Sequence, residues 1–479
     1  MSNHSSSTIA AVSTALSESG IGIIRVSGSD AVSVCTGILY DSKGKTVLDK
    51  MEAGNFRHCF VKSGDDLIDE CIVLLYKAPH SYTGEDTVEL QCHGGVFLLK
   101  KVLDLVISKG AVLASPGEFT RRAFLNGKMD LAQAEAVMDI ISARSESALR
   151  ASEDQMSGRV SGVIRDLRAK ILYETAYIES AIDDSEHYDL DGYDDHVKDI
   201  VNELRSRIKK LIESYNSGRF VREGISTCIA GRPNSGKSSL LNLLTGQDRA
   251  IVSDIPGTTR DTIEEYVRFD EILLRLTDTA GIRNTDDPIE SIGAKKALDA
   301  ASGADLVLFM IDASEYLDID DMEIFSSIYE KKTIILLNKA DKTLKIKPHD
   351  IYEHFRESAN ASIRELSEEE FLEKYPCVVI SASGGQGLNN LKSVVKRLFF
   401  NGKISSSSEV VITGLRHKEL LVRADESLSN VLECIESGME TDIYTIDLMD
   451  AYRCLGLIIG EEVGDDLADE IFSKFCMGK

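Results

Sequence analysis

No run of apolar residues in this sequence is long enough to cross a membrane. The strongest candidates, Leu306 to Ile311 and Thr333 to Leu337, are short, whereas a membrane-spanning helix needs about 20 apolar residues. A secretory signal is not indicated either, because no Lys or Arg precedes Arg25 and the N-terminus has no apolar core segment. We therefore expect a cytoplasmic protein without a membrane partner.

The sequence is also poor in paired cysteines and in positive charge. Its nine cysteines are scattered without metal-binding spacing, which is typical of reduced cytosolic thiols and not of a disulfide framework. Lys and Arg number 54 against 79 Asp and Glu, which gives a net charge of -25. The average field of such a chain repels nucleic acid, so an RNA contact must depend on a local basic patch or on a basic partner.

What is present is the pattern of a large folded protein whose 479 residues predict roughly three domains. Residues 1–128 mix short strands with a few helices, and residues 129–222 have helical spacing. Residues 223–402 alternate apolar strands with helices, and residues 403–479 return to helical spacing. We expect a multidomain fold with an N-terminal α+β domain and an all-α helical domain made of two separated segments. An α/β domain with a doubly wound parallel sheet is expected to be inserted between those segments.

One segment has the pattern of a phosphate-binding loop. The apolar stretch Ile225 to Ala230 leads into Gly231-Arg-Pro-Asn-Ser-Gly236-Lys237-Ser238, and a helical stretch follows. This matches G-x-x-x-x-G-K-[ST] in the strand–loop–helix context that the motif requires. Backbone N–H groups of such a loop converge on phosphate oxygens. Lys237 is expected to reach the β- and γ-phosphates, and the Ser238 hydroxyl is expected to ligate Mg²⁺.

Three downstream motifs identify the nucleotide. Asp278-Thr-Ala-Gly281, Asn338-Lys-Ala-Asp341 and Ser381-Ala-Ser383 each follow a short apolar strand. The Asp341 carboxylate can accept two N–H bonds from guanine, whereas adenine lacks the 2-amino group that donates one of them. Sites built on such bonds reject the wrong ligand by factors of about 10⁴–10⁵. The four motifs in this order predict a GTP site.

A switch segment, Ser253 to Asp261, lies between the first two motifs, and its Thr259 is expected to complete the Mg²⁺ shell. Ile282 stands after the Asp278 motif, where an aliphatic side chain cannot orient the attacking water. Hydrolysis therefore needs another polar group and another positive charge. The residues expected to contact GTP are Asn234, Ser235, Gly236, Lys237, Ser238, Ser239, Ser253, Asp254, Ile255, Pro256, Gly257, Thr258, Thr259, Asp278, Thr279, Ala280, Gly281, Asn338, Lys339, Ala340, Asp341, Ser381, Ala382 and Ser383.

These motifs carry a resemblance to one known family. GRPNSGKSSLLN, DIPGTTRD, DTAG, NKAD and the C-terminal FCMGK, together with GIIRVSG, YTGEDTVELQCHGG and PGEFTRRAFLNGK near the N-terminus, resemble the MnmE (TrmE) family of tRNA-modification GTPases. The resemblance extends from about residue 8 to residue 479. The motifs outside the α/β domain separate this family from other P-loop GTPases.

The resemblance implies a reaction that the spacing does not give. The family adds a carboxymethylaminomethyl or aminomethyl-type group to C5 of the wobble uridine of certain tRNAs, with an FAD-dependent partner, MnmG (GidA), in a heterotetramer. A folate, 5-formyl- or 5,10-methylene-tetrahydrofolate, supplies the one-carbon unit and binds the N-terminal domain. That domain has a folate-binding fold like that of aminomethyltransferases and forms the homodimer. GTP hydrolysis in the family requires K⁺.

The family's functional positions can be carried over residue by residue. The resemblance implies that K⁺ is ligated by Asn234, Ser253, Ile255 and Thr258, and that Ser238 and Thr259 ligate Mg²⁺. Glu290 is implied to position the water, and Lys237 and Cys476 are the other residues expected to act in catalysis. Folate contacts fall on Arg25, Glu89, Lys128 and Lys479. The chain ends in C-M-G-K where the family most often has C-I-G-K, which is a volume-conserving change.

Two other functions stay open at this point. One is a regulatory or ribosome-assembly GTPase without tRNA chemistry, although such proteins usually carry a basic RNA-binding module. The other is a folate-dependent one-carbon transferase that GTP only regulates. If tRNA is the substrate, the acidic balance predicts that the partner supplies most of the basic surface. Local help is then expected from Arg121, Arg122, Lys128, Arg165, Arg168 and Lys170.

Overall fold

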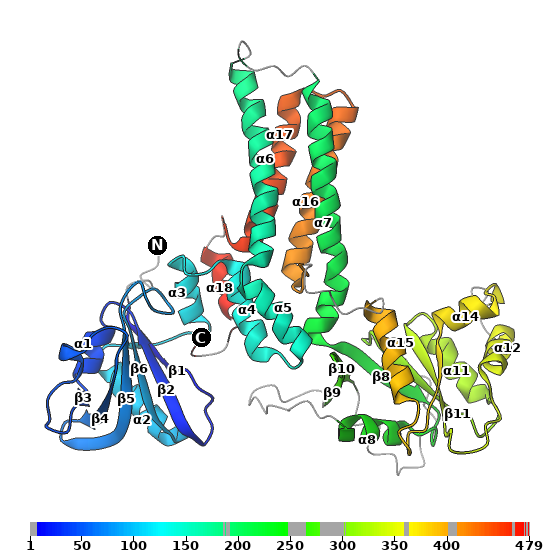
Figure 1. The fold of residues 1–479 in the computed structure, drawn as a ribbon, viewed down its shortest axis with the longest axis horizontal. Helices are drawn as coiled ribbons and strands as arrows, with labels where there is room; N and C mark the ends of the chain where they lie inside the picture. The colour runs from blue at the N-terminus through cyan, green and yellow to red at the C-terminus, as the bar shows by residue number, and fades with distance from the viewer. Residues whose placement is uncertain are drawn as a thin grey trace. The chain divides into compact units, whose positions relative to one another are not determined.

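The computed structural model describes residues 7–184, 187, 192–247, 265–277, 301, 303–358, 364–400, 410–461, 465–473, 475 and 478 (Figure 1). The chain divides into two compact units. One comprises Met1–Ile141, Gln155–Leu204 and Arg423–Lys479, and the other comprises Ser142–Asp154 and Arg205–Val422. The division passes through helices α5 (Glu146–Met156), α7 (Tyr193–Glu223) and α16 (Leu415–Glu436). The domain boundaries at residues 128, 222 and 402 therefore stay predictions.

The first unit contains a seven-stranded sheet with the strand order β3-β4-β5-β6-β2-β1-β7. Its pairs are antiparallel except for β1 with β7, which is parallel. The strands are β1 (Ile9–Val12), β2 (Ser19–Ser27), β3 (Leu39–Tyr40), β4 (Phe56–Ser63), β5 (Asp66–Tyr76), β6 (Thr87–Gly94) and β7 (Val112–Leu113). Alternate residues of these strands form a buried apolar core with helices α1 (Ala31–Thr36) and α2 (Val96–Ser108). A short 3₁₀ helix, η2, spans Leu48–Lys50. The expected α+β domain is confirmed.

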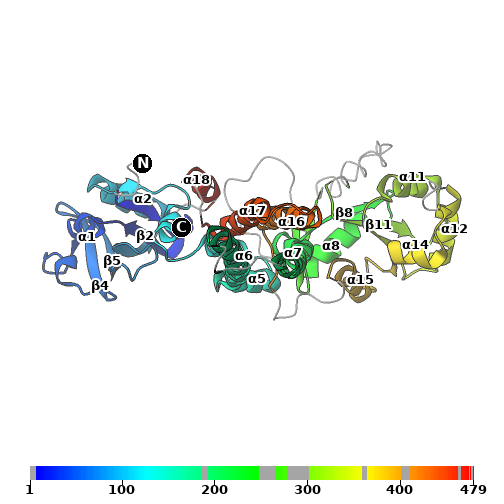
Figure 2. The ribbon, with the colours of Figure 1, turned by 90° about the horizontal axis from the view of Figure 1, so that it is seen from above.

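Helices from both ends of the chain complete the first unit. After α3 (Glu118–Leu125) and α4 (Leu131–Ser142), the long helix α6 (Arg159–Asp183) packs along α17 (Thr441–Ile459), and the two lie side by side in Figures 1 and 2. The two helices approach closely at Gly456 of α17, because this residue has no side chain. A Cβ there would lie 2.9 Å from the guanidinium of Arg168. The prediction of one helical layer from two separated segments is confirmed.

The second unit contains a six-stranded sheet with the order β13-β12-β11-β8-β10-β9, parallel except at the β9 edge. The strands are β8 (Ile225–Gly231), β9 (Glu265–Phe269), β10 (Ile272–Leu276), β11 (Leu306–Asp312), β12 (Thr333–Asn338) and β13 (Cys377–Val379). The described helices are α8 (Lys237–Gln247), α11 (Ile319–Ile328), α12 (Pro348–Ser358), α14 (Glu368–Lys374) and α15 (Leu388–Phe400). Successive residues of β11 enter two different core clusters, so both faces of the sheet are covered. This is the expected doubly wound α/β arrangement.

The second unit also incorporates a segment that precedes its first strand by about 75 residues. Ala148 of α5 is buried in one core cluster of the α/β domain. The Arg144 guanidinium lies 3.8 Å from the centre of the Tyr266 ring on β9, and the Ser147 hydroxyl donates to the Glu271 carbonyl at 2.8 Å. The sequence pattern assigned this segment to the helical domain, but these contacts attach it to the β9–β10 hairpin.

Among the described residues, none of the helices combines the length and the apolar character that crossing a membrane requires.

Candidate functional site

The phosphate-binding loop joins strand β8 to helix α8. Asn234 has φ 62°, and the flanking Gly231 and Gly236 have φ 147° and 105°. Side chains at the two glycines would also collide with their surroundings. A Cβ on Gly231 would lie 2.4 Å from the Met310 carbonyl, and one on Gly236 would lie 2.1 Å from Asn338 Nδ2. The predicted strand–loop–helix context is therefore confirmed, and the loop conformation depends on both glycines.

Lys237, Ser238 and Ser239 form the first turn of α8, where helix N–H groups without partners in the helix favour anions. The Lys237 Nζ donates to the carbonyls of Gly231 and Arg232, each at 2.8 Å. The ammonium group is thus held across the mouth of the loop by the loop's own backbone. The contact of Lys237 with phosphates stays a prediction of the motif.

Asn338 connects three of the predicted motifs. The side chain is buried, and its Nδ2 donates to the Ser235 carbonyl at 2.7 Å. Its Oδ1 accepts from the Ala382 N–H at 2.9 Å. The sequence assigned Asn338 to the edge of the guanine. The structure gives this residue a further task, because its amide ties the phosphate-binding loop to the segment Ser381–Ser383.

Asp341 lies at the end of the same strand and is exposed. Its carboxylate accepts from the Ser381 hydroxyl at 2.6 Å and from the Ser383 hydroxyl at 3.4 Å. The Ser381 hydrogen bond is the main cause of a lowered pKa of Asp341, so the carboxylate is ionised at neutral pH and can accept N–H groups of a base. The neighbouring Lys339 has φ 67° and pairs with Asp312 at the end of β11, while the Ala340 N–H donates to the Ile380 carbonyl.

Several predicted residues lie outside the part of the chain that the structure describes. They are the switch residues Ser253, Asp254, Ile255, Pro256, Gly257, Thr258 and Thr259, the motif Asp278, Thr279, Ala280 and Gly281, and Glu290, Cys476 and Lys479.

In the first unit, Arg25 and Glu89 are direct cross-strand partners on β2 and β6. The Arg25 Nε and a Glu89 carboxylate oxygen are 2.8 Å apart, and each side chain is 14% exposed. The guanidinium also lies over the rings of Tyr82 and Phe119, at 5.2 and 5.6 Å from their centres. Within the described residues, the buried Arg25 Nη1 has no hydrogen-bond partner. The two predicted residues therefore form one half-enclosed site with unused donor capacity.

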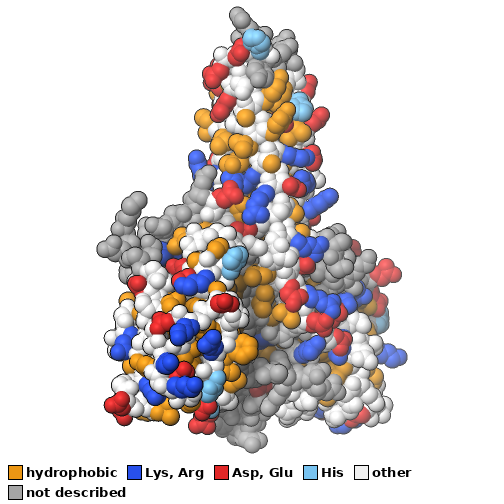
Figure 3. Space-filling view, turned by 60° about the vertical axis from the view of Figure 1, so that its left-hand side comes forward, with side chains coloured by type: hydrophobic (Ala, Val, Ile, Leu, Met, Phe, Trp, Pro, Cys, Tyr) orange, Lys and Arg blue, Asp and Glu red, His pale blue; other side chains and the backbone are white. Residues whose placement is uncertain are grey.

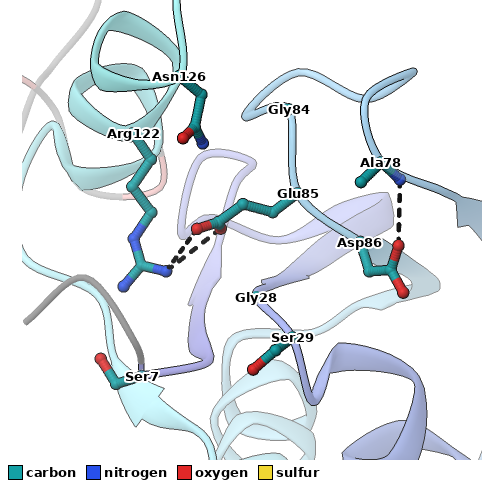
Figure 4. Close-up of a pocket in the computed structure, with 9 residues that line it drawn as sticks. All are labelled: Ser7, Gly28, Ser29, Ala78, Gly84, Glu85, Asp86, Arg122 and Asn126. Atoms are coloured by element: carbon teal, nitrogen blue, oxygen red, sulfur yellow. Dashed lines mark hydrogen bonds and ion pairs between the residues drawn. The ribbon is translucent and has the colours of Figure 1, made fainter.

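Lys128 follows α3 and is exposed, and its Nζ donates to the Pro79 carbonyl at 3.0 Å. Its stem lies beside a cavity of about 450 Å³, since a Cβ on Gly84 in the cavity wall would lie 3.4 Å from Lys128 Cγ. Figure 4 shows this cavity, which is lined by Ser7, Gly28, Ser29, Ala78, Gly84, Glu85, Asp86, Arg122 and Asn126.

Arg122 is the main cation of this cavity. It is held by the Glu85 carboxylate at 3.2 Å and by Glu118 at 2.8 Å. The arginine is 5% exposed, as is Arg168, so these two residues are not surface cations, and their contact with tRNA stays a prediction that this burial disfavours. Basic and acidic side chains are interspersed on the face drawn in Figure 3.

Described residues on each side of Cys476 contact the N-terminal sheet or the helix that follows it. Helix α18 (Asp465–Ser473) packs against α3, and Phe472 and Phe475 are buried. A Cβ on Gly117 would lie 2.5 Å from the Phe472 carbonyl. Gly478 has φ 88°, and a Cβ there would lie 2.3 Å from the Val12 carbonyl on β1. Since β1 pairs with β2, with Ala11 opposite Arg25, Gly478 lies against the strand next to the one that carries this arginine.

The geometry thus defines a P-loop nucleotide-binding domain of the guanine-specific class, in one chain with an α+β domain and a two-segment helical layer. Comparison with known proteins gives the family. The family model of the MnmE helical domain matches residues 131–476, and the family model of the N-terminus of the GTP-binding protein TrmE matches residues 8–128. The chain belongs to the MnmE family of tRNA modification GTPases and is an enzyme of the GTP-hydrolysing class.

Individual relatives agree. The chain is 45% identical over 472 residues to the tRNA modification GTPase MnmE of Lachnoclostridium phytofermentans, covering 98% of this chain and 99% of that protein. It is 40% identical over 476 residues to the protein of the same name from Clostridioides difficile, with coverage of 98% and 99%. Among solved structures, the G domain of the T. maritima FeoB iron transporter has a TM-score of 0.24 and 26% identity, covering 35% of this chain and 94% of that one.

Proposed function

We propose that this protein hydrolyses GTP in order to modify C5 of the wobble uridine of certain tRNAs. The added group is of the carboxymethylaminomethyl or aminomethyl type, and an FAD-dependent MnmG (GidA) partner takes part. The observation that carries the proposal is the presence in one chain of two built sites. One is the guanine-type loop assembly around Asn338. The other is the half-buried Arg25–Glu89 pair, on strands β2 and β6 of the sheet whose neighbouring strand β1 contacts Gly478.

The chain's own residues would bind and orient the nucleotide. The backbone of the phosphate-binding loop and Lys237 receive the phosphates, and the ionised Asp341 accepts N–H groups of guanine. A Mg²⁺ ion, held by Ser238 and Thr259, would neutralise charge on the β- and γ-phosphates. Ser238 fits this task because it lies in the first turn of α8, next to Lys237.

For hydrolysis, we propose that K⁺ supplies the missing positive charge. Asn234, Ser253, Ile255 and Thr258 would hold it. The exposed Asn234, with its left-handed backbone in the middle of the loop, has a polar side chain suited to this ion. A monovalent cation there stabilises negative charge that develops in the transition state, as an arginine finger does. Glu290 would position the water, a task that Ile282 cannot perform.

For the one-carbon unit, we propose that a 5-formyl- or 5,10-methylene-tetrahydrofolate binds at the Arg25–Glu89 pair. The fit rests on two features. The buried Arg25 Nη1 has no hydrogen-bond partner among the residues that the structure describes, and the aromatic rings of Tyr82 and Phe119 lie beside the guanidinium. Arginine and lysine suit the folate carboxylates, and the Glu89 carboxylate can accept from the aminopyrimidine ring. Lys128, Cys476 and Lys479 would complete the site. The folate would supply the carbon that is transferred.

The remaining partners follow from charge and from the family. A homodimer through the N-terminal domain and a heterotetramer with MnmG are proposed, and the protein is expected in the cytoplasm. Because Arg122 and Arg168 are buried and the chain carries a net charge of -25, we propose that most of the basic surface for tRNA belongs to the partner.

The test is the modified-nucleoside content of tRNA from a strain that lacks this gene and carries variants of it. Arg25→Met and Glu89→Gln should each abolish the wobble modification while purified protein still hydrolyses GTP. Arg57→Met is the matched control, because Arg57 is an exposed arginine of the same sheet, and it should support full modification. A deletion strain with normal tRNA nucleosides would refute the proposal and favour a regulatory or ribosome-assembly GTPase.

A further inference from the structure

The second residue of the phosphate-binding loop, Arg232, is tied to α11, the helix that follows the neighbouring strand β11. Its Nε donates to Asp321 at 2.8 Å, and its Nη1 donates to Asp318 at 3.1 Å. The side chain of Arg232 is 15% exposed and that of Asp321 is 0% exposed. Both aspartates belong to the start of α11, Asp318 as the N-cap and Asp321 in the first turn.

Asp321 has two partners that fix its position. One carboxylate oxygen accepts the hydrogen bond from the Arg232 Nε–H. The other accepts from the Asp318 backbone N–H at 3.2 Å, and this bond is part of the cap of the helix. Burial raises the pKa of Asp321, and the Arg232 charge opposes this rise. A fully buried carboxylate is costly unless it is paired and hydrogen-bonded, and the Arg232 guanidinium and the Asp318 N–H together meet this need at Asp321.

The backbone of the same arginine holds the lysine of the motif. The Lys237 Nζ donates to the Arg232 carbonyl at 2.8 Å and to the Gly231 carbonyl at 2.8 Å. Gly231 is itself fixed, since its φ of 147° and the nearby Met310 carbonyl allow no side chain there. The Arg232 carbonyl belongs to the peptide bond with Pro233, and the anchored Arg232 side chain adds a restraint on the orientation of this carbonyl.

We propose that Asp321 is a positioning residue for GTP binding, and that it acts through Arg232 to keep the Lys237 ammonium aimed at the phosphates. Asp321 touches neither nucleotide nor lysine. It fixes the Arg232 side chain, the side chain restrains the Arg232 peptide, and the peptide carbonyl orients Lys237. The inference rests on the proposed nucleotide site and adds a residue that no nucleotide motif contains.

The expected effect is on affinity. Lys237 is expected to contact the β- and γ-phosphates before and during hydrolysis, so a less restrained lysine loses binding that ground state and transition state share. Such a loss raises KM and leaves kcat nearly unchanged. Asp321→Asn keeps the shape and removes the charge. We expect this change to weaken the binding of both GTP and GDP by about tenfold, which corresponds to about 1.4 kcal/mol. The kcat should stay within about threefold of the wild-type value.

The measurement is equilibrium titration with GTP and GDP at a temperature where circular dichroism shows each variant to be folded, followed by KM and kcat for GTP. Asp320→Asn is the matched control, because Asp320 is an exposed aspartate of the same helical turn, and it should bind both nucleotides like the wild type. A purely structural Asp321 would lower the melting temperature and leave the affinities unchanged, and that result would overturn the proposal.

A second pair of variants keeps the test decisive if Asp321→Asn does not fold. Arg232→Met leaves the Asp321–Asp318 cap intact and should show the same loss of affinity. Arg232→Lys can still pair with Asp321 and should recover part of it. If the wild type binds neither nucleotide, the nucleotide site itself is wrong. If the wild type binds GTP and GDP, and Arg232→Met and Arg232→Lys bind them as tightly as the wild type does, the nucleotide site stands and only the positioning role fails.

Discussion

Replacing Gly478 by alanine should detach the C-terminal tail from the N-terminal sheet. The residue has φ 88°, and a left-handed backbone costs an alanine about 1–2 kcal/mol. This alone lowers the ratio of docked to undocked tail by about 5–30-fold. The new methyl group would also lie 2.3 Å from the Val12 carbonyl and 2.9 Å from Ser13 Cα, and both are backbone atoms that cannot move aside. The docked arrangement should therefore be lost.

Two measurements follow this change. Hydrogen exchange should show faster exchange at the C-terminus, and tRNA from cells with only the variant should lack the wobble modification. The GTPase rate of the purified protein should stay at the wild-type value, because the nucleotide loops lie in the other compact unit. Full modification by a variant with an undocked tail would refute the reasoning, since the tail would then have no part in the proposed folate site.

The control separates strain from collision. Gly438 also has a left-handed backbone, with φ 67°, but a Cβ there meets no atom within 4 Å. Gly438→Ala therefore carries the conformational cost without the clash, and it should lose about 1–2 kcal/mol of stability while tRNA modification stays complete.

Further outcomes are expected of variants in the nucleotide site and of one variant in the C-terminal tail. GTP turnover should be far faster in K⁺ than in Na⁺ at equal ionic strength, Asn234→Ala should remove that difference, and equal wild-type rates in the two salts would exclude the ion. Asp341→Asn should weaken GTP and favour xanthosine triphosphate, whose 2-oxo group accepts from an amide, and an unchanged GTP affinity in an equilibrium titration would contradict the role of this residue. Glu290→Ala should leave the GTP dissociation constant nearly unchanged and slow turnover by about 10²–10⁴-fold, whereas Cys476→Ser should hydrolyse GTP normally and lose tRNA modification. Normal hydrolysis by Glu290→Ala would mean that another residue holds the water.

The sequence motifs predicted the structural features that depend on neighbouring residues. The strand, loop and helix around Gly231–Ser238 lie as expected, because glycines with left-handed φ and a helix N-terminus are local needs that leave a local pattern. The sheet types were also predictable, since apolar runs such as β11 are buried on both faces. The prediction of Arg25 and Glu89 as site residues came from the family resemblance alone. No pattern in the sequence indicates that these two residues, 64 positions apart, form an ion pair.

Most of the missed features are long-range. Arg122 and Arg168 look like surface cations in the sequence. Glu118 stands only four residues before Arg122, but Glu85, which also holds Arg122, and Gly456, which packs on Arg168, are distant in the chain. The close approaches of Gly117 and Gly478 depend on helices and strands from opposite ends of the chain. The tie between Arg232 and Asp321 crosses 89 residues and links a loop to a helix cap, so only the folded arrangement reveals it.

The docking of the segment around Arg144 on the β9–β10 hairpin changes how this enzyme can be dissected. A fragment cut at the apparent limits of the α/β domain, residues 223–402, would leave the Tyr266 ring without its cation, the Glu271 carbonyl without its hydroxyl donor and a gap where Ala148 fills the core. An isolated GTPase domain of this protein therefore also needs residues 142–154. The sequence does not indicate this requirement, because the segment precedes the domain by about 70 residues.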